Sequence, residues 1–198
     1  MDPLIKQWRQ DQRARLLAQR RTIAPADRQR AAQVIGDKLS ELVAADGCAT
    51  IGLFWPIKQE VNLLPWSEEL VRERKVVLCL PVVVQRGEPL EYWRWRSGEP
   101  LQRGFWDIPI PATRDVVVPD LMLAPLVGFD RANYRLGYGG GYFDRTLASL
   151  PRRPVVAGVG FAFSELATIF PQPHDIPLDV VLTETTEASS GDRSDHVP

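Results

Sequence analysis

Four glycines fall within residues 137–141, between an apolar run and a short amphipathic one. Glycine has no Cβ, so such a segment takes up positive φ angles and brings several backbone N–H groups close to an anion. Arg135 and Arg145 add fixed positive charge, and Asp144 offers the hard oxygen ligand that Mg²⁺ prefers. A helix that begins near Tyr142 adds its dipole. The segment therefore predicts a triphosphate-binding site.

The loop matches neither of the better-known glycine fingerprints. A Walker A loop needs a Gly-Lys-Ser/Thr sequence, and no lysine follows Lys75. The dinucleotide pattern G-x-G-x-x-G fails as well, because a pattern that starts at Gly137 ends on Tyr142. A plain glycine-rich turn between a strand and a helix is the alternative interpretation.

The composition sets limits on the class of protein. With 198 residues, 44% of them hydrophobic, the chain is suited to one domain with a sizeable core. A net charge of −1 argues against nucleic-acid binding through bulk charge. Lysine occurs only at positions 6, 38, 58 and 75. Arginine therefore carries most of the positive charge, which favours bidentate contacts with phosphates or carboxylates.

Cysteine and histidine are too scarce for several kinds of chemistry. The two cysteines, Cys48 and Cys79, lie in or beside apolar runs without C-x-x-C spacing. His174 and His196 are the only histidines, so a zinc site or a histidine-based triad has little to draw on. The N-terminus lacks a secretory segment, and no apolar run approaches eighteen residues. We therefore expect a soluble, cytoplasmic protein that does not enter a membrane.

Two helices are predicted at the N-terminus. Residues 2–21 are polar and arginine-rich with a few spaced apolar positions. Pro25 suits the first turn of a second helix, in which apolar residues recur at three- and four-residue steps until Gly47. An arginine-rich helix is also compatible with a solvated face or with contacts to RNA.

Strands and helices then alternate along the chain. Residues 51–55 and 76–80 are short apolar runs on either side of a helix candidate at 64–72, which indicates a β-α-β unit. Further strand candidates are 121–127, 155–161 and 180–182. This alternation predicts one α/β domain with a mostly parallel, doubly wound sheet covered on both faces. The glycine loop then leaves the carboxyl end of the strand near Leu121, where such sheets bind ligands.

The remaining segments are less regular. Residues 92–95 are expected to form a half-exposed strand, and the proline-rich segment 100–119 to form an ordered but irregular connection. Residues 187–198 show no apolar period and are expected to form a loose tail, which leaves residues 1–186 as the domain.

Taken as a unit, residues 125–145 resemble 5-formyltetrahydrofolate cyclo-ligase, also called 5,10-methenyltetrahydrofolate synthetase. The match follows the order P-x-x-x-F-D and then R-L-G-x-G-x-G-Y-x-D, and it includes Trp-Asp-Ile-Pro at 106–109 and Ile-Pro-Leu-Asp at 176–179. It covers nearly the whole chain. The resemblance implies a single three-layer α/β/α domain and the ATP- and Mg²⁺-dependent closure of 5-formyltetrahydrofolate to 5,10-methenyltetrahydrofolate.

In the reaction that the resemblance implies, the formyl oxygen takes the γ-phosphoryl group of ATP. A folate nitrogen then closes on the activated carbon, and phosphate departs. Phosphoryl transfer asks a protein mainly for positioning and charge neutralisation, which suits glycines, arginines and carboxylates. The scarcity of cysteine and histidine is then expected.

The resemblance also implies a nucleotide site. Arg9 and Arg13 lie one helical turn apart and match a basic pair that holds the phosphates, with Lys6 as an alternative first contact. Together with them, the implied ATP-binding set is Arg135, Gly137, Tyr138, Gly139, Gly140, Gly141, Tyr142 and Phe143.

Asp144 and Asp179 match the family's Mg²⁺ carboxylates, although a turn or capping aspartate is the plainer interpretation of Asp179. Arg135 and Asp144 are the implied catalytic residues. The folate contacts match Trp55, Glu60, Trp106 and Tyr142. A carboxylate opposite a pterin accepts two N–H bonds from that ring, whereas core packing is the alternative role of a lone tryptophan.

The chain departs from the family pattern at three positions. Several members carry basic side chains at the positions of Tyr138 and Gly140, and a tyrosine is frequent where Phe143 stands. Arg9, Arg13, Arg135 and the metal ion are then expected to carry more of the phosphate charge. A folate- or nucleotide-binding protein without turnover is the second hypothesis, and an RNA-associated protein the third. We expect a monomer that binds no nucleic acid.

Overall fold

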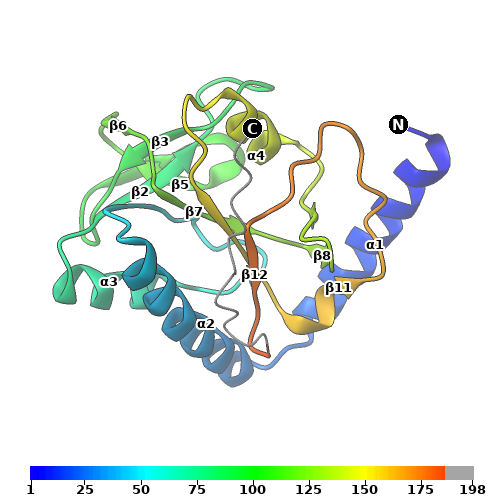
Figure 1. The fold of residues 1–198 in the computed structure, drawn as a ribbon, viewed down its shortest axis with the longest axis horizontal. Coiled ribbons are helices and arrows are strands. Elements are labelled where there is room, and N and C mark those ends of the chain that lie inside the picture. Colours follow the sequence, from blue (N-terminus) through cyan, green and yellow to red (C-terminus); the bar gives the residue numbers. More distant parts are fainter. Residues whose placement is uncertain (186–198) are drawn as a thin grey trace.

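The computed structural model describes residues 1–185 (Figure 1). In this part of the chain the main sheet has seven strands in the order β12-β10-β7-β1-β2-β3-β6. The first five strands in that order are parallel, and β3 and β6 add antiparallel pairs at one edge. Their bounds are β1 Thr50–Gly52, β2 Val77–Val82, β3 Glu91–Arg94, β6 Val116–Val117, β7 Leu121–Pro125, β10 Val155–Val159 and β12 Val180–Leu182.

The helices lie where the sequence predicted them. Their bounds are α1 Pro3–Arg21, α2 Pro25–Asp46, α3 Leu64–Glu73 and α4 Tyr142–Ser149. The Asp2 carboxylate caps α1 by accepting a hydrogen bond from the Leu4 amide at 2.8 Å. Gly47 ends α2 in the left-handed conformation, at a φ of 62°.

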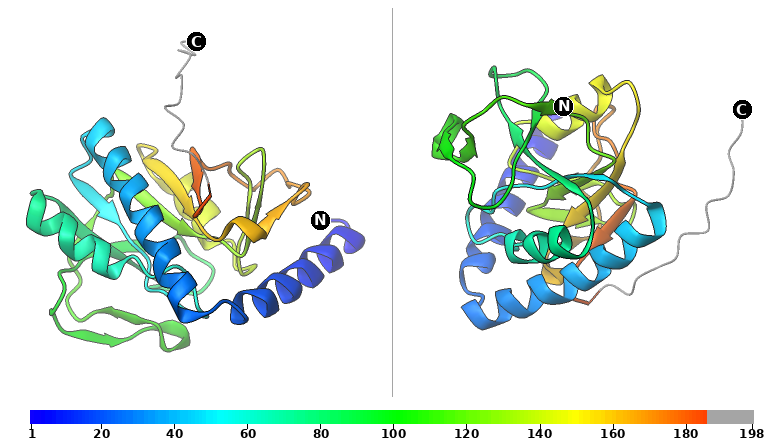
Figure 2. Two further views of the ribbon diagram at one scale, coloured as in Figure 1. Left: turned by 90° about the horizontal axis from the view of Figure 1, so that it is seen from below. Right: turned by 90° about the vertical axis from the view of Figure 1, so that its left-hand side faces the viewer.

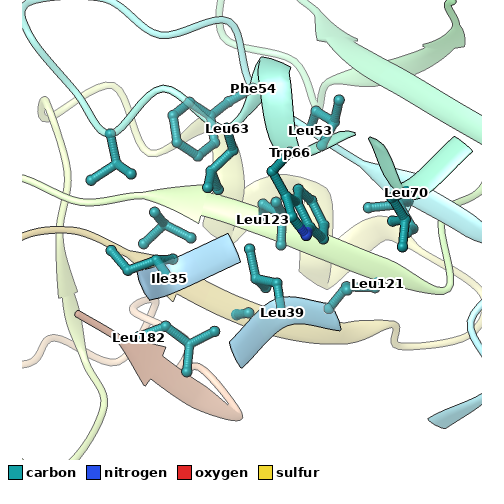
Figure 3. Packing of buried hydrophobic residues seen from close by; sticks show 14 of the residues in the cluster. Ile35, Leu39, Leu53, Phe54, Leu63, Trp66, Leu70, Leu121, Leu123 and Leu182 are labelled. Carbon is teal, nitrogen blue, oxygen red and sulfur yellow. The ribbon is translucent and has the colours of Figure 1, made fainter. Parts of the chain in front are cut away.

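Helices cover both faces of the sheet, as expected for a doubly wound α/β domain (Figure 2). Successive residues of β7 point to opposite faces. Leu121 and Leu123 pack in the cluster formed with α2 and α3, which Figure 3 shows from close by. Met122 packs on the other side, in the cluster that contains Leu147 of α4. The three-layer arrangement is therefore confirmed.

Two small sheets accompany the main one. The first joins β8 Gly128–Asp130, β9 Arg135–Leu136 and β11 Glu165–Leu166, and the second joins β4 Leu101–Arg103 and β5 Pro109–Pro111. The 3-10 turns are η1 Phe105–Asp107 and η2 Ala162–Ser164.

The sequence predicted that the glycine loop directly follows the parallel strand β7. In the structure it does not. Pro125 ends β7 because it cannot donate a ladder hydrogen bond. The chain then forms the β8-β9 hairpin, in which the buried Asp130 carboxylate accepts bonds from the amides of Ala132 and Tyr134. The loop therefore leaves the end of β9.

The expectation of a half-exposed strand at residues 92–95 is wrong. Tyr92, Trp93 and Trp95 are all buried, and only Arg94 is exposed. The reason is that β3 is not an edge strand, since it pairs with β2 on one side and β6 on the other. β6 comes from the proline-rich connection, which is more regular than predicted.

No helix in residues 1–185 combines the length and apolar character needed to cross a bilayer. The expected cytoplasmic location stays a prediction. The predicted tail, residues 187–198, lies outside the described residues.

The packing of α2 allows a matched test of the core. Val43 is 2% exposed and Val34 is 37% exposed on the same helix. Val43→Ala leaves a cavity and should lower the free energy of unfolding by about 2 kcal/mol. Val34→Ala should change it by less than about 0.5 kcal/mol. Urea unfolding of both variants measures the difference, and equal losses would contradict the proposed packing.

Candidate active site

One cavity of about 640 Å³ lies at the carboxyl ends of the parallel strands. Strand order reverses between β1 and β7, because β2 lies on one side of this pair and β10 on the other. In open α/β sheets the crevice at such a switch point binds ligands. Its walls come from α1, the segment after β1 (residues 54–60), the glycine loop and the region of Trp106.

The glycine loop forms one wall of the cavity and ends where α4 begins. Gly139 and Gly141 have φ angles of 96° and 65°, which few other residues adopt without strain. Gly141 is the N-cap of α4, so the helix starts at Tyr142 as predicted. Arg145 donates to the Gly140 carbonyl at 2.8 Å and stacks over the Tyr142 ring. The loop thus presents its backbone at the positive end of a helix.

Three arginines of α1 face the protein. Arg9, Arg13 and Arg20 are four and eleven positions apart, close to one and three full turns. Arg9 donates to the carbonyls of Ile169 and Phe170, at 2.9 and 3.0 Å. These contacts fasten the helix to the domain. The side chains of Arg9 and Arg20 are both buried, so they are not available on an exposed face for RNA.

Arg13 is the arginine of α1 that meets the glycine loop. Its Nε donates to the Gly137 carbonyl at 2.7 Å, and its guanidinium lies 3.5 Å from where a Cβ on Gly139 would stand. A Cβ at position 139 would make an ordinary van der Waals contact with Arg13, so it is the φ of 96° that favours glycine there. Lys6, the alternative first contact, is exposed and does not line the cavity.

Arg135 and Asp144 form a partly buried pair in the wall of the cavity. The Arg135 guanidinium lies over the Phe143 ring, 4.7 Å from its centroid, and its Nη2 is 3.4 Å from Asp144 Oδ2. Burial lowers the pKa of Arg135, which Asp144 offsets in part. The guanidinium remains charged, because an arginine pKa stays far above neutral pH.

Glu60 is a buried carboxylate with few neutralising partners. It accepts the Ile57 amide at 2.9 Å and the Tyr138 hydroxyl at 2.7 Å. Burial raises the pKa of Glu60, and these bonds together with the charge of Arg20 do not compensate fully. Further N–H donors from a ligand would therefore stabilise the ionised carboxylate.

Aromatic side chains form the remaining walls. Trp55 packs edge-on against Trp95, with centroids 6.1 Å apart. Trp106 is 59% exposed and has a φ of 57°, and its ring meets Tyr142 edge-on at 5.6 Å. An exposed tryptophan in a strained conformation at a cavity mouth is typical of a ligand contact.

The structure brings Asp175 to the cavity, whereas the predicted Asp179 does not line it. Asp179 lies at the amino ends of β10 and β12, where it accepts the Val156 amide at 2.7 Å and faces Arg153. Asp175 Oδ2 accepts from Arg9 at 2.5 Å. Ile176, the next residue, donates its amide to Asp144. Besides Glu60, the carboxylates that line the cavity are thus Asp144 and Asp175.

Charge is balanced unevenly around the cavity. Burial and the neighbouring Arg9 lower the pKa of Arg13, so its charge is only partly compensated. Burial alone would raise the pKa of Asp175, but hydrogen bonds from Arg9 and the Gln172 amide hold it below its usual range. The side near Arg13 therefore favours an anion, and the side near Glu60 favours donors.

Apart from Asp179, every residue of the predicted site lines this one cavity. Sequence reasoning missed Asp175 and Lys58, which also line it, and Arg20, which lies behind it. The spacing of Arg20 from Arg9 was a usable signal, since eleven residues make three helical turns. Lys58 and Asp175 lie in irregular segments without any periodic signal.

The model of the 5-formyltetrahydrofolate cyclo-ligase family matches residues 5–184. The chain is 28% identical over 174 residues to the 5-formyltetrahydrofolate cyclo-ligase of Mycoplasma pneumoniae, covering 87% of this chain and 96% of that protein. It is 30% identical over 173 residues to the Escherichia coli enzyme of the same name, covering 83% and 93%.

Solved structures of 5,10-methenyltetrahydrofolate synthetases are also similar to this chain. The chain resembles a 5,10-methenyltetrahydrofolate synthetase from Aquifex aeolicus, with a TM-score of 0.79, 28% identity and coverage of 95% and 96%. A synthetase from Mycoplasma pneumoniae gives a TM-score of 0.73, with 26% identity and coverage of 89% and 98%.

The fold and site define a ligase of the α/β class. The chain belongs to the 5-formyltetrahydrofolate cyclo-ligase family, whose substrates are a formyltetrahydrofolate and ATP.

The pair between Arg9 and Asp175 predicts a pH-dependent contribution to stability. Because the folded protein lowers the pKa of Asp175, the pair stabilises the fold above the usual aspartate pKa and less as pH falls through the lowered value. Asp175→Asn should lower the free energy of unfolding at pH 7 by about 2 kcal/mol, and this deficit should shrink toward pH 3.

Denaturant unfolding at several pH values measures this deficit. Asp11→Asn is the control, since Asp11 is exposed on the same helix that carries Arg9. A deficit that stays constant from pH 7 to pH 3 would rule out the ionic contribution.

Proposed function

We propose that this chain catalyses the ATP- and Mg²⁺-dependent cyclisation of 5-formyltetrahydrofolate to 5,10-methenyltetrahydrofolate, with release of ADP and phosphate. One observation carries the proposal. A single cavity joins a side that favours an anion, at Arg13 and the glycine loop, to a side that favours N–H donors, at Glu60. A nucleotide triphosphate and a reduced folate have these complementary groups.

The nucleotide side is built from backbone and guanidinium groups. The phosphates of ATP would lie against the amides of residues 137–141, at the N-terminus of α4. Arg13 comes from α1 and Arg135 from β9, so two separate elements supply positive charge to the cavity. Arg9 contributes by fastening α1, since its Nε and Nη2 already donate inside the protein.

The folate side combines a carboxylate with flat apolar walls. Glu60 would accept two N–H bonds from the amino-pyrimidine edge of the pterin. Trp55, Trp106 and Tyr142 line the same cavity and suit the faces of a planar ring.

The residues fit a magnesium ion that arrives with the nucleotide. Asp144 and Asp175 would hold it, and one or two carboxylates plus phosphate oxygens are the usual ligands of Mg²⁺ in such sites. Within residues 1–185 no cluster of three or more potential ligands forms a closed metal cage. When bound, the ion would neutralise charge on the transferred phosphoryl group.

The residues present can support the chemistry by positioning. The formyl oxygen attacks the γ-phosphorus while the bond to the leaving ADP oxygen breaks. A folate N–H nitrogen then attacks the formyl carbon, loses its proton, and the carbon–oxygen bond breaks to release phosphate. Arg135 lies where it could stabilise charge on the transferred group, and no protein nucleophile is required.

Turnover and two cavity variants test this proposal. Wild-type protein with ATP, Mg²⁺ and 5-formyltetrahydrofolate should produce the absorbance of methenyltetrahydrofolate. Arg135→Ala and Asp144→Asn should each lower kcat/KM by about a hundredfold, because the first removes a cation that would stabilise the transferred phosphoryl group and the second removes a carboxylate that would hold Mg²⁺. Circular dichroism checks that both variants fold.

Arg131→Ala is the control, because Arg131 is an exposed arginine that pairs with Glu165 outside the cavity. Full activity in both cavity variants, or no product from the wild type, would refute the proposed reaction.

A second pair of variants tests the metal carboxylates. Asp175→Asn should raise the Mg²⁺ concentration needed for half-maximal activity by about tenfold or more, because it removes a ligand charge. Asp179→Asn removes a carboxylate at the opposite edge of the sheet and should leave that concentration unchanged. The reverse result would favour the original assignment of Asp179.

A further inference from the structure

Arg20 is among the largest fully buried side chains of the protein, although it carries a charge. Its Nη2 donates to the Leu126 carbonyl at 2.5 Å, and its Nη1 donates to the Tyr138 hydroxyl at 3.2 Å. Its Nε is buried and has no hydrogen-bond partner within residues 1–185. A buried cation with an unsatisfied N–H costs stability, so its retention calls for an explanation.

The Tyr138 hydroxyl links Arg20 to Glu60 by two hydrogen bonds. It accepts a hydrogen bond from Arg20 and donates its single proton to Glu60 Oε1 at 2.7 Å. Burial, and then the charge of Glu60, raise the pKa of Tyr138, which keeps the phenol protonated as a donor. The three side chains therefore form one directed chain of hydrogen bonds, in which each bond polarises the next.

The chain fixes the orientation of the Glu60 carboxylate. Tyr138 holds Oε1 and the Ile57 amide holds Oε2, so each oxygen has one fixed donor. A carboxylate oxygen has two lone-pair sites, which leaves one on each oxygen for a ligand. Arg20 Nη1 lies 4.0 Å from Oε1, too far for a direct bond, so its charge acts mainly through the hydroxyl.

We propose that Tyr138, backed by Arg20, is a positioning residue that orients Glu60 toward the paired N–H groups of the folate. Tyr138 then serves the folate side of the cavity, although it lies within the loop assigned to the phosphates. This inference rests on the proposed function, because it assumes that Glu60 meets a folate.

Equilibrium binding in a double-mutant cycle tests this role. Calorimetry measures the affinity of wild type, Tyr138→Phe, Glu60→Gln and the double variant for 5-formyltetrahydrofolate and, separately, for ATP. Tyr138→Phe loses one hydrogen bond to a charged group and should weaken folate binding about tenfold. ATP binding should change less than twofold.

The effect should depend on Glu60. In the Glu60→Gln background the same change at Tyr138 should alter folate affinity less than twofold, since the carboxylate that it orients is gone. In turnover, Tyr138→Phe should raise KM for the folate while kcat changes less than twofold. Arg20→Lys keeps the charge without the planar fork, and it should weaken folate binding in the same selective way.

Tyr134→Phe is the matched control, because Tyr134 does not line the cavity. Weaker ATP binding with unchanged folate binding in Tyr138→Phe, or an equal loss in both backgrounds, would overturn the inference. A wild type that binds the folate without turnover would refute the proposed reaction, while the cycle still decides the role of Tyr138. A wild type that binds no folate would overturn both.

Discussion

The site depends on how α1 is attached to the rest of the domain. This helix lies beside the small sheet β11-β8-β9 and outside the main one, and Arg9, Arg13 and Arg20 donate to backbone carbonyls of other segments (Figure 1). Buried guanidinium groups are stable only where their N–H groups find such acceptors. The hydrogen bond from Arg13 to the Gly137 carbonyl is the central contact, because it joins α1 to the glycine loop, and both line the cavity.

The sheet places this loop opposite a second, acidic wall. β1 and β7 are neighbours at the point where strand order reverses, so the segments that follow them diverge and leave space between them. One segment carries Glu60 and the other leads to the glycine loop. Burial leaves the charge of Glu60 and that of Arg13 only partly compensated, with opposite signs. One cavity thus contains a partly compensated negative charge and a partly compensated positive charge, and two different substrates can neutralise them together.

Much of this was predictable because the main elements carry strong local signals. Proline and glycine marked both ends of α2, and the apolar runs marked the parallel strands. The β8-β9 hairpin was missed because strands of two or three residues are too short to show a period. Asp175 and Asp179 have the same chemistry four positions apart, and only the course of the chain into β12 separates them. Arg20 was missed because its partners, Tyr138 and Glu60, are distant in sequence.

The most direct test of the account is the structure of a complex with Mg²⁺ and a non-hydrolysable ATP analogue. The account predicts that the terminal phosphate contacts the backbone amides of residues 137–141 and the Arg13 guanidinium, with the folate space beside Glu60 left open. A phosphate chain bound away from the glycine loop, or an Arg13 side chain turned away from it, would contradict the central claim.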